Sequence, residues 1–245
     1  MISVVVLAAV AFAAGVVDSI AGGGGLLTVP ALLATGLPPQ LVLATNKGQA
    51  SFGAISSFLS FWSKDGIDRH RAFRGFVFGF LGSLVGARVL LLVRPEPLKP
   101  IILVLLLAAA GFVAYPRKVT PHPRSWAMQA LAPIAFVLGF YDGFFGPGVG
   151  SMLIVAFVLV FGDSLTRASG NAKVVNLASN LAALLLFSVK GAVMWRIALP
   201  MAAANATGAF VGARLAVKRG DGFVRVIVLL VVTLLVLKMA YDLAR

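Results

Sequence analysis

The chain of 245 residues contains no cysteine and only two histidines. Without cysteine the protein has no disulfide, no thiolate metal site and no cysteine nucleophile. His70 and His122 lie in predicted loops, and the only glutamate, Glu96, stands between two prolines. A metalloenzyme or a triad hydrolase needs inward-facing histidine and acid groups at suitable spacing. We therefore expect neither an enzyme nor a bound cofactor or metal.

Acidic residues are also scarce: Asp and Glu number 8 against 21 Lys and Arg, which gives a formal net charge of +13. The basic residues stand in short connections between apolar runs, as in cytoplasmic loops, and no basic stretch is continuous enough to follow a nucleic-acid backbone. Hydrophobic residues make up 60% of the chain, and its mean hydropathy is +1.00. A soluble domain of this size cannot bury so much apolar surface. The composition predicts an all-α, polytopic membrane protein that lies in the lipid bilayer and binds no nucleic acid.

Two of the apolar runs are too short to cross a membrane alone. The runs are 2–17, 26–35, 41–61, 73–93, 98–115, 127–141, 150–161, 172–188, 195–217 and 222–241. Roughly 20 residues are needed to cross the hydrocarbon, so 26–35 and 150–161 are predicted half-helices. Residues 2–35 and 127–161 are then discontinuous elements, each either one broken span or a hairpin that dips to mid-membrane.

Counting each broken element once gives about eight transmembrane helices, four in each half. The Pro-rich, basic stretch 116–125 is the predicted linker. It separates an N-terminal membrane repeat, 1–115, from a C-terminal membrane repeat, 126–245, of one transporter domain.

An aspartate and a glycine cluster interrupt both halves at matching places. Asp18 precedes Gly22–Gly25, and Asp142 precedes Gly146-Pro-Gly148, which places the two acids 124 residues apart (142 − 18). Further landmarks follow in the same order: Thr45-Asn46-Lys47 and Gly86-Ala-Arg88 in the first half, Gly170-Asn171-Ala-Lys173 and Gly212-Ala-Arg214 in the second. Duplicated breaks in apolar segments are typical of transporters built from repeats. The sequence leaves open whether the repeats are parallel or inverted.

These motifs resemble the TauE/SafE family of sulfite and organosulfonate permeases, and within it the YfcA-like branch. The resemblance is carried by the break after Asp18, by Thr45-Asn46-Lys47, and by the stretches 139–148 and 171–180, and it covers essentially the whole chain. It implies a multi-pass permease of a prokaryotic cytoplasmic (inner) membrane that exports sulfite or an organosulfonate. It does not fix which anion this chain carries.

The same residues suit a small anion on physical grounds. A helix N-terminus offers unpaired N–H groups and partial positive charge, and glycine lets a ligand approach the backbone closely. Lys47 and Lys173 supply full positive charge, and Lys173, Asn176 and Asn180 share one helix face. The residues predicted to bind the substrate are Gly22, Gly23, Gly24, Gly25, Asn46, Lys47 and Gln49 in the first half and Gly146, Gly148, Asn171, Lys173, Asn176 and Asn180 in the second. Because Ala50 and Ala54 match Asn176 and Asn180, the site is expected to rely more on the second half.

Asp18 and Asp142 have two candidate roles. A carboxylate inside a membrane is costly and usually functional, so each could take up and release a proton during transport. Alternatively, each caps its broken helix or pairs with a lysine across the pseudo-twofold axis.

Other interpretations compete at several positions. The lysines could extend to the headgroups, as we expect for Arg88 and Arg214, and the asparagines and glycines could serve helix packing. A proton- or Na⁺-linked cation carrier that uses Asp18 and Asp142 is the alternative function, and a structural membrane protein is the second. The direction of transport, the coupling ion and the oligomeric state, monomer or homo-oligomer, are left open by the sequence.

Overall fold

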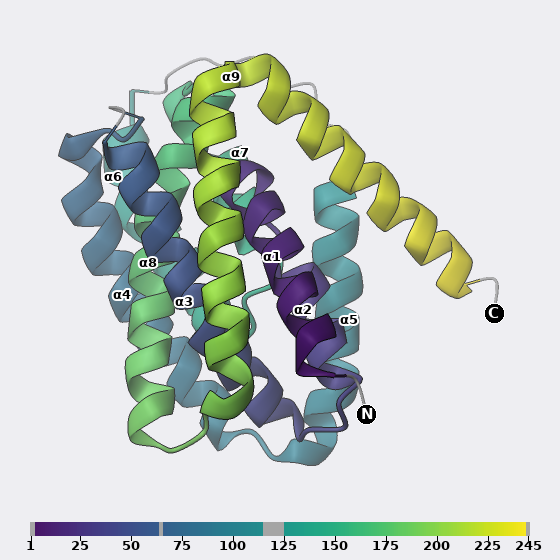
Figure 1. Cartoon of the computed structure of the whole chain (residues 1–245). Coiled ribbons are helices and arrows are strands. Elements are labelled where there is room, and N and C mark those ends of the chain that lie inside the picture. The colour runs from purple at the N-terminus through teal and green to yellow at the C-terminus, as the bar shows by residue number, and fades with distance from the viewer. Residues whose placement is uncertain (1–2, 64–65, 115–124, 244–245) are drawn as a thin grey trace.

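The computed structural model describes residues 3–63, 66–114 and 125–243, and this part of the chain contains nine helices and no strand (Figure 1). The helices are α1 (Val4–Ala21), α2 (Gly25–Leu33), α3 (Pro39–Trp62), α4 (Arg69–Leu92), α5 (Pro95–Ala114), α6 (Ala127–Phe144), α7 (Val149–Phe161), α8 (Leu165–Val189) and α9 (Trp195–Leu243). The expected all-α fold is confirmed. The predicted linker, 116–125, lies outside the described residues except for Ser125.

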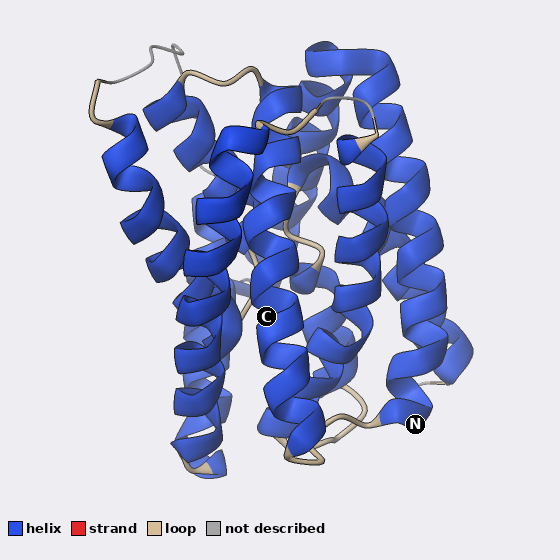
Figure 2. Ribbon diagram, turned by 90° about the vertical axis from the view of Figure 1, so that its left-hand side faces the viewer, coloured by secondary structure: helices blue, strands red, loops and turns tan. Residues whose placement is uncertain are grey.

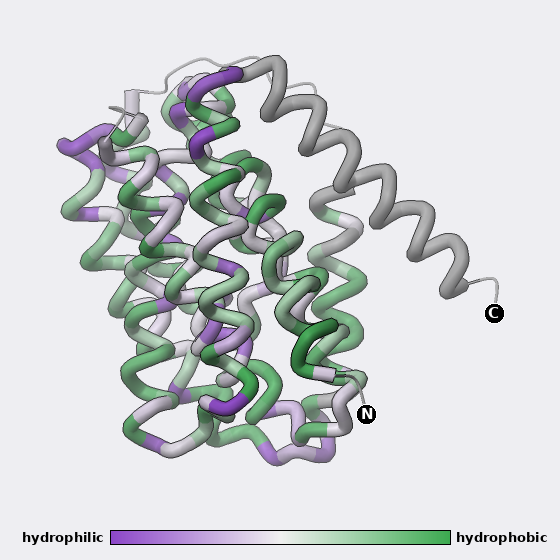
Figure 3. Tube along the Cα trace, in the orientation of Figure 1, coloured by the Kyte–Doolittle hydropathy of each residue, from purple (hydrophilic) through white to green (hydrophobic). Residues whose placement is uncertain are grey.

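The helices have the composition of a membrane protein. Among the described residues, four are long and apolar enough to cross a bilayer: α1, α4, α6 and α8. In the coloured part of the tube in Figure 3, hydrophobic residues predominate along the helices, and hydrophilic residues are most frequent near the two ends of the bundle. The two runs expected at 195–217 and 222–241 belong to the single helix α9. Glycine and charged residues separate these runs, and each of them keeps the backbone N–H that a proline at this point would lack.

Close contacts at glycines show that α1, α3 and α9 run in the same direction. Gly208 of α9 lies against Phe12 of α1. One turn farther along both helices, Gly212 lies against Val16. The contacts of α3 advance along α9 in the same sense: Gly48 lies against Ala198, and Gly53 against Ala209. The three helices are therefore parallel.

A second set, α4, α6 and α8, runs in the opposite direction. Gly139 of α6 lies against Gly79 of α4, and Gly143 lies against Ser83 one turn later. Along α8, Val175 contacts Gly79, and the Ser179 carbonyl accepts a hydrogen bond from the Ser83 hydroxyl. Only residues 63–68 join α3 to α4, so the chain reverses there and the two sets are antiparallel.

These directions decide between the two forms of broken element that the sequence allows. Since α1 and α3 begin at the same end and run the same way, α2 must return toward that end between them. The same argument applies to α7, which lies between the parallel helices α6 and α8. Both breaks are thus turns of re-entrant hairpins, and Figure 2 shows loop segments inside the helical bundle. The hairpins enter from opposite ends, as expected for inverted repeats, although the repeat itself stays a prediction.

Helix packing does not follow the predicted halves. Helix α4, in the first half, packs most extensively on α6 and α8 of the second half. Helix α9, in the second half, packs most extensively on α1 and α3 of the first half. The two sequence halves have therefore exchanged one helix each: α4 packs with helices of the second half, and α9 packs with helices of the first half.

Candidate functional site

The turns of the two hairpins cross at backbone distance. A Cβ atom on Gly22 would lie 2.2 Å from the Ser151 backbone nitrogen, and one on Gly25 would lie 3.0 Å from Pro147 Cα. The Ser151 hydroxyl donates a hydrogen bond of 2.9 Å to the Ala21 carbonyl, which fixes one turn on the other. Gly22, Gly23, Gly146 and Gly148 all have positive φ angles, a backbone conformation that favours glycine. The glycine clusters are required by this crossing.

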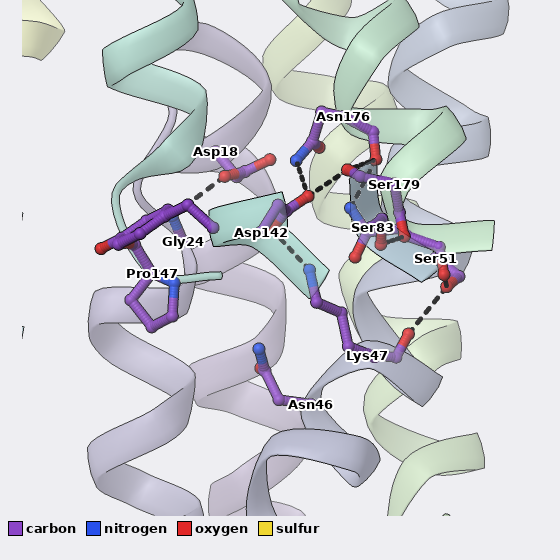
Figure 4. Close-up of polar contacts among 12 residues, drawn as sticks. Asp18, Gly24, Asn46, Lys47, Ser51, Ser83, Asp142, Pro147, Asn176 and Ser179 are labelled. Carbon is purple, nitrogen blue, oxygen red and sulfur yellow. Dashed lines mark hydrogen bonds and ion pairs between the residues drawn. The ribbon is translucent and has the colours of Figure 1, made fainter. Parts of the chain in front are cut away.

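A small polar cavity of about 40 Å³ lies beside the crossing (Figure 4). Since one water needs roughly 10–15 Å³ of such space, the cavity has room for a few waters or one small ion. Twelve of the fifteen residues singled out from the sequence line it: Asp18, Gly23, Gly24, Gly25, Asn46, Lys47, Gln49, Asp142, Gly146, Gly148, Asn176 and Asn180. The N-termini of α2 and α7 both face this space, because Gly24, Gly25, Gly148 and Val149 are among its lining residues.

Lys47 forms a buried ion pair with Asp142. Its Nζ lies 2.5 Å from Asp142 Oδ1, and the two side chains are 4% and 2% exposed. The Asn176 amide donates a 3.3 Å hydrogen bond to the other carboxylate oxygen, which also accepts from the Ser179 hydroxyl. Three donors from α3 and α8 thus converge on the carboxylate of Asp142 in α6 (Figure 4). The charge of Lys47 is neutralised inside the protein.

Lys173 makes the reciprocal pair with Asp18. Its Nζ lies 3.0 Å from Asp18 Oδ2 and also donates to the Asp18 backbone carbonyl. The other carboxylate oxygen accepts a 3.0 Å hydrogen bond from the Gly24 N–H, which caps the start of α2. Side-chain exposure is 0% for Lys173 and 29% for Asp18. Each half therefore supplies a lysine to the aspartate of the other half, the pairing that the sequence offered as one of two roles for these acids.

Amide side chains complete the polar lining. In the first half, the Asn46 carbonyl oxygen accepts hydrogen bonds from Thr28 Oγ1, at 2.6 Å, and Gln49 Nε2, at 2.9 Å. In the second half, Asn180 Nδ2 donates 2.7 Å to the Asn176 carbonyl of the preceding turn. Two buried side-chain oxygens, Gln49 Oε1 and Asn180 Oδ1, have no partner among the described residues. Buried polar atoms of this kind are normally satisfied by a partner or by water.

Three of the residues predicted from sequence lie outside the cavity lining. Gly22 is at the hairpin crossing and Lys173 behind Asp18, while Asn171 is in a separate polar network near the start of α8. Asn171 donates 2.7 Å to Asp163 and accepts 2.7 Å from the Asp68 N–H. The guanidinium of Arg71 joins the same two acids, at 2.9 Å from Asp163 and 2.7 Å from Asp68.

This network lies outside the cavity and stabilises one end of the bundle. Partial burial tends to raise the pKa of Asp68, but hydrogen bonds from Arg71 outweigh it and hold that pKa below the ordinary value. Asn171 thus orders a connection between helices, and among the described residues it is not part of the cavity lining.

Sequence reasoning missed two polar residues near the cavity. Asn205 of α9 lines it, and its side chain donates 3.0 Å to the Ala11 carbonyl of α1. Ser179 hydrogen-bonds the Asp142 carboxylate. In the sequence, Asn205 could have been noticed as a single amide within the apolar run 195–217. Ser179 could have been noticed because it stands next to Asn180. Neither has a counterpart in the duplicated motifs.

Four charges gather at the site, two positive and two negative, so the described centre is close to neutral. The described residues contain no group of three or more His, Asp or Glu side chains able to hold a metal ion. A small ion entering the cavity would therefore meet paired charges, amide groups and two helix N-termini.

Comparison with known proteins identifies the relatives of this chain. The family described as "Sulfite exporter TauE/SafE" matches residues 7–239. A "Probable membrane transporter protein" of Haemophilus influenzae is 37% identical over 240 residues, which cover 97% of this chain and 94% of that protein. "Probable membrane transporter protein YfcA" of Escherichia coli strain K12 is 37% identical over 97% of this chain and 89% of its own length. "Probable membrane transporter protein YunE" of Bacillus subtilis is 25% identical over 98% of both chains. No solved structure matches the chain.

Proposed function

Because the chain belongs to the sulfite exporter TauE/SafE family and is a multi-pass membrane transporter, we propose that its cargo is a small sulfur-containing anion. The cargo is sulfite or an organosulfonate, exported across the inner membrane of a prokaryote. The observation that carries the proposal is the cavity at the hairpin crossing, lined by Lys47, by amide groups and by the starts of α2 and α7.

The positive charge of Lys47 at the site is available to an anion, because the lysine can change its ion-pair partner. Lys47 is paired with Asp142 and is buried, and such a charge must keep a partner. An oxyanion in the cavity can take the place of the carboxylate as that partner, while the helix N-termini and the amides donate hydrogen bonds to its other oxygens. This exchange keeps the lysine paired, and the displaced Asp142 carboxylate takes up a proton, because it would otherwise be a buried charge without a counter-ion. Amide donors bind without the strength that would prevent release.

Basic residues give a proposed orientation. The end of the bundle that holds the α3–α4 connection carries Arg69, Arg71, Arg74, Arg167, Arg214, Lys218 and Arg219, and the other end carries Arg88, Arg94, Lys190 and Arg196. Short cytoplasmic loops carry an excess of Lys and Arg. We therefore place the α3–α4 end at the cytoplasm. The hairpin of α6 and α7 then enters the membrane from the cytoplasmic side.

A second candidate function rests on Asp18. Its side chain is 29% exposed although it lines a cavity deep in the bundle. A carboxylate with this access could bind H⁺ or Na⁺ as the main cargo. In a cation carrier of that kind the lysines would matter little for flux, and the two aspartates would be essential.

Flux in proteoliposomes separates these functions. Uptake of labelled sulfite is measured in the presence of sulfonates, carboxylates or phosphate as competitors, for wild type and a Lys47→Ala/Lys173→Ala variant. We expect saturable flux that sulfonates inhibit. The flux should fall at least about tenfold in the variant, because losing only about 1.4 kcal/mol of attraction between the lysines and the anion already gives a factor of ten. The matched control is Lys190→Ala/Lys218→Ala, which removes two exposed lysines and should leave flux unchanged.

Two results would contradict the anion proposal. One is wild-type protein that moves no anion but moves H⁺ or Na⁺ in a manner that depends on Asp18 or Asp142. The other is an equal loss of flux in the cavity variant and in the control. Each variant is first shown to be folded and monodisperse in detergent, so that a loss of flux reports on the site.

A further inference from the structure

We infer that transport proceeds by motion between two packed bodies that differ from the two sequence repeats. The first body consists of α1, α2, α3 and residues 195–219 of α9, and the second body of α4, α6, α7 and α8. The inference rests on the proposed transport function and goes beyond it, because it states which helices move together. Helix α5 packs on members of both bodies and is assigned to neither.

Within each body the helices interlock at backbone distance. A Cβ on Gly208 would lie 2.1 Å from the Phe12 carbonyl oxygen, and a Cβ on Gly82 would lie 2.1 Å from that of Phe136. The first contact joins α9 to α1 and the second joins α6 to α4. These contacts recur on the next turn of each pair, at Gly212 and Gly86, so the paired backbones cannot slide without a clash. These helix pairs are therefore expected to move as units. The close contact between the bodies, at Gly22 and Ser151, is confined to the two hairpin turns and can serve as a pivot.

Specific bonds add to this packing inside each body. In the first body, the Ser56 hydroxyl of α3 donates 2.8 Å to the Ala206 carbonyl of α9. In the second body, the buried guanidinium of Arg71 in α4 holds Asp163, between α7 and α8, through two hydrogen bonds of 2.9 and 3.0 Å. A buried pair of this geometry is hard to break, since removal of either partner leaves an uncompensated charge. Both bonds join residues from different sequence halves.

Between the bodies, hydrogen bonds join Ser151 to the Ala21 carbonyl at the hairpin crossing and Gln40 to the Val93 carbonyl at one end of the bundle, and the charged contacts lie at the cavity. The two ion pairs are of this kind, because Lys47 and Asp18 belong to the first body and Asp142 and Lys173 to the second. The Ser169 hydroxyl of α8 donates 3.0 Å to the Ile20 carbonyl of α1 close by. A ligand that exchanges partners with an ion pair thus acts directly on the interface between the bodies. This is the place where a bound ion can change the relative stability of two arrangements.

The covalent connections between the bodies suit a hinge. The chain passes from the first body to the second between α3 and α4, and returns between α8 and α9. These two short connections lie at opposite ends of the bundle. Rocking of one body on the other would close one end of the cavity while opening the other.

Cross-linking distinguishes this motion from rocking of the sequence halves, and the chain needs no prior removal of cysteine. Ile20→Cys/Ser169→Cys joins the two bodies, and Ser56→Cys/Ala206→Cys lies within the first body. Both pairs replace a serine that hydrogen-bonds a backbone carbonyl across two helices, and both join the first sequence half to the second. Labelled sulfite flux is measured for each before oxidation, after oxidation and after reduction.

We expect oxidation to lower flux at least about tenfold for the Ile20/Ser169 pair, reversibly, and to change it less than twofold for the Ser56/Ala206 pair. If both links block flux, the sequence halves are the moving units and the inference is overturned. It is overturned equally if neither link blocks flux. Absence of flux in the reduced proteins and in wild type would instead contradict the proposed function.

A distance measurement decides the inference even when no substrate is transported. Spin labels are placed at exposed positions of the protein in nanodiscs: Phe73→Cys/Val137→Cys on α4 and α6 of the second body, and Leu59→Cys/Leu185→Cys on α3 and α8 of different bodies. We expect one narrow distance for the first pair, with or without sulfite, and a broad or two-peaked distribution for the second. A narrow distance between the bodies, or two distances within the second body, would overturn the inference.

Discussion

Replacing Lys47 with alanine is expected to lower anion flux at least about tenfold and to reduce the free energy of unfolding by about 3–5 kcal/mol. The reason is the carboxylate that remains. Asp142 is 2% exposed and its ammonium partner is 2.5 Å away, so the substitution leaves a buried charge without a counter-ion. Asn176 and Ser179 still donate to that carboxylate, but a hydrogen bond does not neutralise it.

The double variant Lys47→Ala/Asp142→Asn separates stability from transport. It removes both charges and keeps an oxygen that can accept from Asn176 and Ser179, so most of the lost stability is expected to return. Flux is expected to stay low, because the positive charge that attracts the anion is still absent. Unfolding in detergent and flux in proteoliposomes are compared for both single variants and the double variant, with Lys190→Ala as the exposed control. Recovery of flux together with stability would show that Lys47 serves only to neutralise Asp142.

Gly22→Ala is expected to abolish correctly folded protein. Gly22 has φ of +74°, and its added Cβ would lie 2.2 Å from the Ser151 nitrogen and 2.4 Å from the Gly150 carbonyl carbon. The atoms it meets belong to the backbone of the other hairpin, so no side chain can move aside. A backbone with φ of +74° and ψ of 170° is essentially restricted to glycine and alone costs an alanine about 1–3 kcal/mol, and separation of the hairpins would disturb both ion pairs as well.

Gly36→Ala is the matched control for this prediction. Gly36 has a similar φ of +81°, but its added Cβ would meet nothing within 4 Å. It therefore carries the cost of a positive φ without the clash. Yield of monodisperse protein and melting temperature are compared for the two variants. Similar values for both would mean that the hairpins do not cross as closely as described.

The sequence was sufficient to locate the breaks and most of the cavity lining. Asp18 and Asp142 each lie next to a glycine cluster within an apolar segment, and this identified the two turns. A carboxylate beside flexible backbone is rare inside a membrane and is typical of a break in a helix. The class of protein followed from composition, and it is confirmed by the helical fold and by the family. The short runs 26–35 and 150–161 correctly indicated half-helices, α2 and α7.

Helix directions and partners could not be predicted from the sequence. The glycines at 79, 82 and 86 indicate a close-packing face, but such a face is compatible with any small-residue neighbour. The exchange of α4 and α9 between the halves therefore became visible only in the fold. The partners of Asn171 could not be predicted for the same reason. Its position in a repeated motif suggested that it lines the cavity, but it hydrogen-bonds Asp163 and the Asp68 backbone.

The cavity at the hairpin crossing is expected to open alternately to the two sides of the membrane. Ala50 lines this cavity without taking part in an ion pair, so Ala50→Cys provides a single reporter thiol in a chain that has no other. Its labelling by a membrane-impermeant thiol reagent is measured from each side of oriented vesicles, with and without sulfite. We predict labelling from both sides, with sulfite changing the two rates in opposite directions. Labelling from one side only, unaffected by sulfite, would contradict the account.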